Sequence, residues 1–172
     1  LSEAASIVAF GSDATISAIE TQYPNTPKAL FGHRFSVGVT EEVLPQVLAW
    51  EVGSFDTRGC MAPAAIFCLT DIVPHLDDLA TAMMQCQRAM PRGRVEDEVG
   101  PEWRRRVGLA RRLGQLREGQ GWAITVLPPQ YFEPVALPRM LSLIPVSGPD
   151  ELARVLAPWQ DQLSTMGTDN LL

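Results

Sequence analysis

The feature that most constrains this chain is its alternation of short apolar runs with segments of helical periodicity. Residues 6–10 (SIVAF) and 64–69 (AAIFCL) have the length and composition of buried strands. Residues 41–52 instead carry apolar side chains at the spacing of one helix face. This alternation predicts an α/β fold. We expect further strands at 28–31, 35–40, 122–127, 140–146 and, weakly, 163–166, and further helices at 14–20, 75–89, 101–117 and 149–156.

Length, composition and charge narrow the class of protein. The 172 residues suit one ordinary domain, and 46% apolar with 20% charged residues is typical of a soluble globular protein. A net charge of −6 argues against nucleic-acid binding, because a phosphate-binding surface needs a basic excess. Arginines cluster between Arg88 and Arg117 with acidic residues interleaved, which we interpret as a solvated face.

Other features of the sequence bear on where the protein works. No apolar run approaches the roughly 20 residues that span a bilayer, and the N-terminal residues lack the plan of a signal peptide. The three cysteines have irregular spacing, which suggests neither a disulfide framework nor a zinc site. We therefore expect no membrane span, and a reducing, cytoplasmic setting. The chain begins at Leu1, not at methionine. The sequence is therefore compatible with a fragment, a processed chain or the ordered part of a longer protein.

Cys60 is the strongest candidate for chemistry. It stands in residues 55–63 (FDTRGCMAP), between an expected helix and a buried strand. Gly59 permits close backbone approach, and Pro63 fixes the direction in which the chain leaves. A cysteine on such a turn can face a substrate while its own N–H points at a developing oxyanion, and Arg58 would lower the thiol pKa. The alternative is a small apolar side chain in a loop.

The sequence gives weaker evidence for the other candidate functional residues. Cys68 lies inside an apolar run and Cys86 on an expected helix, so both are predicted to be core residues. Gly11 and Ser12, between a strand and a helix, form a possible phosphate-binding turn without the three glycines of the dinucleotide fingerprint. His33, at a strand break, could line a cleft or be structural. No spacing of histidines and carboxylates suggests a metal site.

Taken in order, three segments resemble the aldehyde dehydrogenase superfamily, and most closely its fatty acyl-CoA reductases, including the reductase component of bacterial bioluminescence. The segments are residues 8–12 (VAFGS), 30–36 (LFGHRFS) and 55–63. The resemblance is strong up to about Leu69 and loose beyond it. It implies an open, twisted, mostly parallel sheet flanked by helices, like the catalytic domain of that superfamily.

The resemblance also implies roles for individual residues. Gly11 and Ser12 would touch the phosphates of NADPH or NADH, and Phe31 and Gly32 would border its nicotinamide. Cys60 would be the nucleophile. Arg58, Gly59 and His33 would lie near the substrate or the oxyanion; these three complete the set of expected site residues.

One departure from the superfamily favours its acylating branch. Hydrolytic aldehyde dehydrogenases place a glutamate just before the second segment, to activate the water that releases the acyl group, whereas residues 28–33 (KALFGH) contain no acid. Proton transfer of that kind contributes roughly 10²–10⁴-fold to a rate. An acyl-enzyme formed here is therefore not expected to be hydrolysed quickly. This favours a reaction that uses an acyl thioester and needs no water.

These observations lead to one hypothesis and two alternatives. The hypothesis is reduction of an acyl-CoA to an aldehyde by NADPH or NADH through an acyl-enzyme on Cys60. Another reaction of the superfamily, aldehyde oxidation or acyl-phosphate reduction, is one alternative, and a non-catalytic α/β binding or assembly domain is the other. Residues 1–172 would form the catalytic domain of a longer enzyme whose dinucleotide-binding domain mostly precedes them. A homo-oligomer or a companion domain is a possible partner, and activity of the chain alone is left open.

Overall fold

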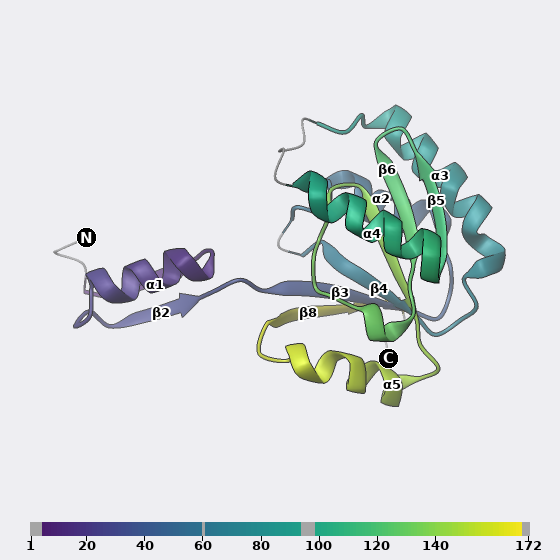
Figure 1. Ribbon diagram of the computed structural model, residues 1–172. Helices are drawn as coiled ribbons and strands as arrows, with labels where there is room; N and C mark the ends of the chain where they lie inside the picture. The colour runs from purple at the N-terminus through teal and green to yellow at the C-terminus, as the bar shows by residue number, and fades with distance from the viewer. Residues whose placement is uncertain (1–4, 60, 94–98, 170–172) are drawn as a thin grey trace. The chain divides into compact units, whose positions relative to one another are not determined.

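The computed structural model describes residues 5–59, 61–93 and 99–169. Its contacts divide the chain into two compact units, Leu1–Arg34 and Phe35–Leu172 (Figure 1). We refer to them as the N-terminal unit and the sheet unit. The assignment of residues 1–172 to one catalytic domain stays a prediction.

The N-terminal unit is a single strand–helix–strand element. Strand β1 (Ile7–Phe10) leads into helix α1 (Asp13–Gln22), and strand β2 (Lys28–Phe31) returns to pair with β1 in parallel. The helix begins one residue before the expected range 14–20, and the Ser12 side chain caps it by accepting a hydrogen bond from the Thr15 N–H at 3.2 Å.

The sheet unit is built on a six-stranded sheet whose order is β5-β6-β7-β4-β3-β8. All neighbouring pairs are parallel except β5 and β6, which form an antiparallel hairpin. The predicted mostly parallel α/β sheet is therefore confirmed. The strands are β3 (Phe35–Thr40), β4 (Pro63–Cys68), β5 (Gln115–Gly119), β6 (Trp122–Val126), β7 (Met140–Pro145) and β8 (Leu163–Thr168).

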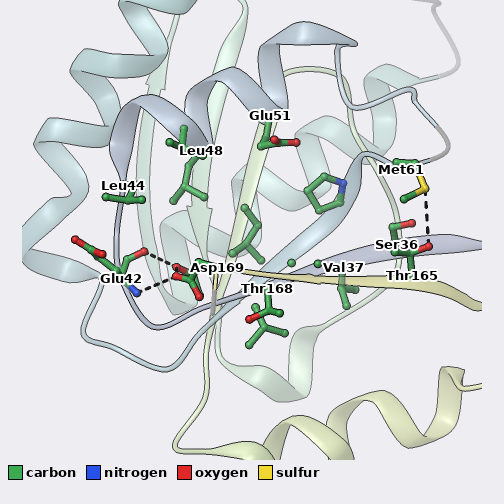
Figure 2. Close-up of a pocket in the computed structure, with 17 residues that line it drawn as sticks. Ser36, Val37, Glu42, Leu44, Leu48, Glu51, Met61, Thr165, Thr168 and Asp169 are labelled. Carbon is green, nitrogen blue, oxygen red and sulfur yellow. Dashed lines mark hydrogen bonds between the residues drawn. The ribbon is translucent and has the colours of Figure 1, made fainter. Parts of the chain in front are cut away.

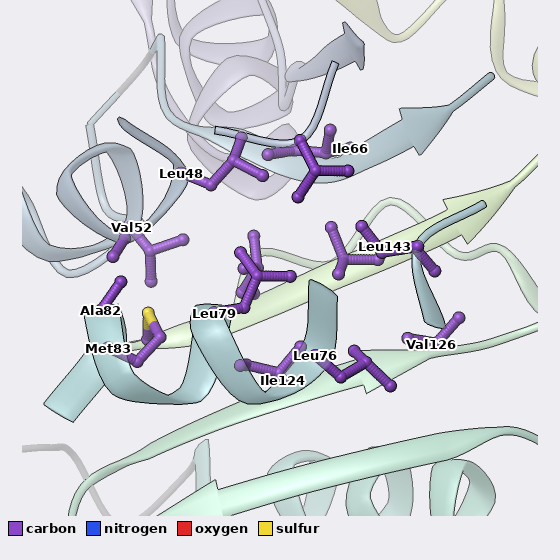
Figure 3. Close-up of a cluster of buried hydrophobic side chains, with 14 of the residues drawn as sticks. Leu48, Val52, Ile66, Leu76, Leu79, Ala82, Met83, Ile124, Val126 and Leu143 are labelled. Carbon is purple, nitrogen blue, oxygen red and sulfur yellow. The ribbon is translucent and has the colours of Figure 1, made fainter. Parts of the chain in front are cut away.

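Helices cover both faces of this sheet. Strand β4 shows why, since Ile66 and Cys68 belong to one core cluster and Ala65 and Phe67 to another. Helices α2 and α3 pack on the first cluster, which Figure 3 shows between them and the strands, and α4 and α5 supply residues to the second. The helices are α2 (Pro45–Ser54), α3 (Leu76–Ala89), α4 (Gly100–Leu113) and α5 (Pro149–Leu156), with short 3-10 turns at Val73–His75, Pro129–Tyr131 and Ala157–Trp159.

Two expected helices differ from the structure by four residues at one end. Helix α2 begins at Pro45 rather than at residue 41, because proline fits the first helical position and lacks the N–H that a later position needs. The expected helix 101–117 ends at Leu113, and residues 115–119 form β5 instead. Gly114 marks the break: a β-carbon there would lie 1.9 Å from the Val126 carbonyl oxygen. Residues 115–117, which the helical periodicity assigned to a helix, form a strand because they pair with β6.

The interpretation of the arginine cluster as a solvated face is wrong for Arg106. Its side chain is 4% exposed and donates to the carbonyl oxygens of Tyr131 at 3.3 Å and Glu133 at 2.9 Å. Arg104 and Arg105 on the same helix are exposed, as expected. Arg106 thus ties α4 to the proline-rich segment before β7. Among the helices that the structure describes, none has the length and apolar character needed to cross a membrane.

Candidate functional site

The structure brings together the four residues expected near a cofactor. Gly11 and Ser12 follow β1, Phe31 ends β2 and Gly32 comes next, so all four lie at the carboxyl end of two parallel strands. The Gly11 N–H donates to the Phe31 carbonyl oxygen at 3.1 Å, which holds the two segments side by side. Ligands bind at this end of parallel strands in many α/β folds.

Asp13 organises this turn, and the sequence interpretation missed it. Its carboxylate accepts a hydrogen bond from the His33 N–H at 3.0 Å. A β-carbon at position 32 would lie 2.5 Å from the same Asp13 oxygen, so Gly32 lets its backbone pass close to the carboxylate. His33 itself is exposed, and the structure places its backbone rather than its ring in this contact.

These residues fit a dinucleotide. The first N–H groups of a helix have no partner within it and carry partial positive charge, which suits a phosphate. Ser12 stands at that end of α1 with an exposed side chain. The rings of Phe10 and Phe31 stack at 4.7 Å, and Phe10 is 77% exposed, so a flat apolar surface lies beside the turn.

Cys60 lies outside the described residues, but the segment that leads to it is described. Helix α2 ends at Ser54, and Asp56 and Thr57 then adopt left-handed backbone conformations with φ values of 51° and 57°. The Arg58 N–H donates to the Phe55 carbonyl oxygen at 2.8 Å, which closes a tight turn. We call residues 55–59 the approach segment. Arg58 is exposed.

Gly59 ends the approach segment. Its carbonyl oxygen accepts a hydrogen bond from the Ala62 N–H at 2.9 Å. A β-carbon at Gly59 would meet Phe55 at 3.5 Å, an ordinary van der Waals contact. The described neighbours therefore leave room for a side chain at this position. Gly59 and Arg58 belong to the sheet unit, whereas the expected cofactor residues and His33 belong to the N-terminal unit.

A buried arginine from a distant part of the sequence holds the approach segment. Arg139, which is 3% exposed, forms an ion pair with Asp56. Its two other guanidinium nitrogens donate to the Gln87 side chain at 3.0 Å and to the Gly53 carbonyl oxygen at 3.1 Å. The guanidinium therefore links the end of α2, the approach segment and the end of α3.

Thr57 provides a second attachment to the same region. Its side chain is buried, and its hydroxyl donates to the Leu137 carbonyl oxygen at 2.5 Å. Leu137 and Arg139 lie just before β7, so one short segment contacts two successive residues of the approach segment. No local pattern signals these contacts; the only hint is that aspartate tolerates a positive φ better than most residues.

A pocket of about 280 Å³ opens in the sheet unit beside Met61, the residue after Cys60. Leu48 of helix α2 and Leu44, the residue before that helix, form one wall, and strands β3 and β8 form the other (Figure 2). Figure 2 places Met61 at one end of the pocket and Asp169 at the other. The pocket therefore runs from Met61 along strands β3 and β8.

Asp169 gives the far end of this pocket a fixed negative charge. Burial acts to raise the pKa of its carboxyl, but hydrogen bonds from the Thr40 hydroxyl and the Glu42 and Glu41 N–H groups outweigh burial and lower the pKa. The distances are 2.5 Å from the Thr40 hydroxyl, 3.2 Å from the Glu42 N–H and 3.1 Å from the Glu41 N–H. The Thr40 contact joins β3 to the end of β8.

The two described cysteines behave as predicted for core residues. Cys68 is 1% exposed, and burial raises the pKa of its thiol to about 12. Cys86 is partly buried and packs against the first core cluster, and burial also raises the pKa of its thiol. Neither thiol is poised to be a nucleophile at neutral pH. Within the described ranges, no group of three or more histidine, cysteine or carboxylate side chains could hold a metal ion.

Comparison with known proteins identifies both a family and a fold. The sequence model of the acyl-CoA reductase (LuxC) family matches residues 1–170. No curated protein matches the chain. Solved structures match well in fold: a mutant of proline utilization A from Bradyrhizobium japonicum has a TM-score of 0.63 at 18% identity, covering 95% of this chain and 20% of that one.

Other solved structures match over a larger share of their length, among them an aldehyde dehydrogenase. The enzyme from Bartonella henselae has a TM-score of 0.60 at 13% identity, covering 98% of this chain and 46% of that one. PnpE, solved in complex with nicotinamide adenine dinucleotide, has a TM-score of 0.63 at 14% identity, covering 98% of this chain and 42% of that one. The chain thus spans less than half the length of these proteins, and at such identities the likeness shows the fold alone.

Proposed function

This chain belongs to the acyl-CoA reductase (LuxC) family, and on that premise we propose that it supplies the nucleophile of an enzyme that reduces an acyl-CoA thioester to an aldehyde. The observation that carries the proposal is an elimination among thiols. The sequence has three cysteines, of which Cys68 is sealed in the core and Cys86 has a raised pKa. Cys60 is then the thiol available for covalent chemistry.

The proposed reaction begins at Cys60. Its thiolate attacks the thioester carbonyl, a carbon–sulfur bond forms, and CoA leaves as a thiolate that takes up a proton. The backbone N–H of Cys60 would stabilise the oxyanion of the tetrahedral intermediate, and the exposed Arg58 would favour the thiolate. Release of the aldehyde returns the thiolate of Cys60.

The N-terminal unit would hold the cofactor. Gly11 and Ser12 would bind its phosphates at the start of α1, and Phe31 and Gly32 would border its nicotinamide. NADPH or NADH supplies the hydride for this reduction when bound. The hydrogen bonds of Gly11 to Phe31 and of His33 to Asp13 support this assignment, because they fix the turn at the start of α1, which the Ser12 side chain caps. A thiol nucleophile must stay reduced, which agrees with a cytoplasmic enzyme.

The test is selective thiol labelling followed by substitution. A limiting amount of iodoacetamide is added to the native enzyme with and without acyl-CoA, and mass spectrometry locates the adduct. We expect Cys60 to be labelled first and to be protected by acyl-CoA, and the Cys60→Ala variant to lose acyl-enzyme formation. Labelling of Cys60 no faster than that of Cys86 would instead favour a non-catalytic α/β domain. A panel of acyl-CoA, acyl-phosphate and aldehyde substrates separates the reactions of the superfamily.

A further inference from the structure

We propose that Arg139 and Asp56 are positioning residues for this acyl transfer. Their ion pair would set the backbone that leads into Cys60, so that its loss slows attack on the thioester without weakening the binding of acyl-CoA. The inference rests on the proposed function and extends it to two residues for which neither the motif nor the family match supplies a role.

The first argument is the number of attachments that one side chain makes. The guanidinium of Arg139 pairs with Asp56 and donates to Gln87 and to the Gly53 carbonyl oxygen. The rigid planar fork of an arginine fixes its partners relative to one another in a way that a lysine cannot. At 3% exposure, Arg139 is also held by packing on every side. The guanidinium therefore sets the position of Asp56 relative to α2 and α3.

The second argument is the conformation that is being held. Asp56 and Thr57 both have positive φ values, which residues other than glycine rarely adopt, least of all a β-branched threonine. Such conformations persist only where the surrounding structure enforces them, and they cluster at functional sites. Here the enforcing contacts come from Arg139 and from the Leu137 carbonyl oxygen. These two strained residues lie shortly before Cys60.

The third argument concerns what the ion pair does for stability. Burying the arginine of this pair is costly, since its side chain is 3% exposed while that of Asp56 is 26% exposed, and apolar side chains of similar volume often stabilise a fold equally well. A largely buried ion pair is therefore poorly explained as a source of stability alone. A role in fixing the geometry of the approach segment explains why Arg139 and Asp56 are both charged and why they meet at this segment.

The experiment compares loop variants with a control of equal burial. Asp56→Ala removes the pair, Asp56→Asn keeps the shape and one acceptor oxygen, and Arg139→Lys keeps the charge without the fork. Arg106→Lys is the matched control, because Arg106 is 4% exposed and also donates to backbone carbonyls but contacts no residue of the approach segment in the hydrogen bonds and ion pairs found. All variants are made in the full-length natural enzyme.

Two measurements separate positioning from general destabilisation. The single-turnover rate of acyl-enzyme formation is followed by intact mass after mixing with acyl-CoA in the absence of cofactor, and kcat and KM are measured with cofactor present. We expect Asp56→Ala to slow acylation about 100-fold with KM within about twofold of wild type, since small misplacements of reacting groups cost about that much. Asp56→Asn should recover about tenfold of that loss, and Arg106→Lys should acylate at the wild-type rate.

Several outcomes would overturn the inference. Acylation by Asp56→Asn and Arg139→Lys at the wild-type rate would do so, and so would a KM that rises while kcat is unchanged. If Asp56→Ala does not fold, the Asp56→Asn and Arg139→Lys rates decide, with about tenfold slowing expected for each. Cys60→Ala keeps the two failures apart: if it still forms an acyl-enzyme, the proposed function is wrong, whereas an inactive Cys60→Ala with fully active Asp56 variants refutes positioning alone.

Discussion

Gly53 on α2 lies directly against the sulfur of Cys86 on α3, so closely that a β-carbon built at position 53 would be 2.1 Å from the Cys86 Sγ. The absence of a side chain at Gly53 thus lets the two helices approach each other. The same glycine offers its carbonyl oxygen to Arg139, so this contact lies next to the network that holds the approach segment.

Substituting this glycine should destabilise the fold, and trimming its neighbour should restore part of the loss. We expect Gly53→Ala to lower the free energy of unfolding by about 1–3 kcal/mol, because the added methyl overpacks the helix contact. Adding Cys86→Ala should recover at least about 1 kcal/mol, a coupling measurable by urea unfolding of the two single variants and the double variant. Gly108→Ala is the control: Gly108 lies on α4 with nothing within 4 Å of its added β-carbon, so about 0.4–1 kcal/mol of stabilisation is expected. Equal effects at the two glycines would contradict this account.

The Thr57 hydroxyl should matter more than its methyl group. Thr57→Val keeps the shape but leaves the Leu137 carbonyl oxygen without this donor, and it keeps a β-branched residue at positive φ. We expect a loss of about 0.5–1.5 kcal/mol in the free energy of unfolding, the net worth of one hydrogen bond, because the Leu137 carbonyl oxygen still accepts from the Met140 N–H at 3.0 Å. Thr57→Ser keeps the donor and should lose less than Thr57→Val. Chemical denaturation measures both, and a Val variant as stable as the Ser variant would show that the hydrogen bond is unimportant.

Neighbouring arginines on α4 should differ sharply in their contribution to stability. Arg106→Leu should cost about 2–3 kcal/mol, because a buried guanidinium no longer donates to the partly buried carbonyl oxygens of Tyr131 and Glu133, and Glu102 loses one of its partners. Arg105→Leu should cost no more than about 1 kcal/mol, since Arg105 is 42% exposed and its ion pair with Glu102 is screened by solvent. Urea unfolding at low and high salt distinguishes them, and a larger loss for Arg105 would refute the assignment.

Cys68 should make the fold less stable at alkaline pH. Its thiol has a pKa of about 12 in the folded state against an ordinary value of 9.0, so between these values the unfolded chain releases a proton that the native state keeps. The native state then binds more protons, and stability falls as pH rises through this window. From pH 8 to pH 10, wild type should lose about 1.4 kcal/mol more than Cys68→Ala. Parallel unfolding curves at the two pH values measure the difference, and identical losses would show that Cys68 does not titrate as described.

Much of the fold was predictable because it depends on local patterns. The strand at residues 35–40 has the bounds of β3, and the helix at 149–156 has those of α5, since period-2 and helical spacing of apolar residues reflect which face of an element is buried. The grouping of Gly11 with Phe31 was implied by the family resemblance, and the parallel pairing of β1 with β2 brings these two strand ends together. The core positions of Cys68 and Cys86 likewise followed from their apolar neighbours.

What the sequence determined by itself was therefore the kind and order of most of its elements, the approximate bounds of those elements, and the motif around Cys60. Only the tertiary structure decided that residues 115–117 pair as a strand, that Arg106 is buried, and that Arg139 meets Asp56 across 83 positions of sequence. Local periodicity is a property of a few consecutive residues, whereas these contacts depend on which strands lie next to each other in the sheet. A short segment before β7 can hold the segment before β4 because those two strands are neighbours in the sheet and far apart in the chain.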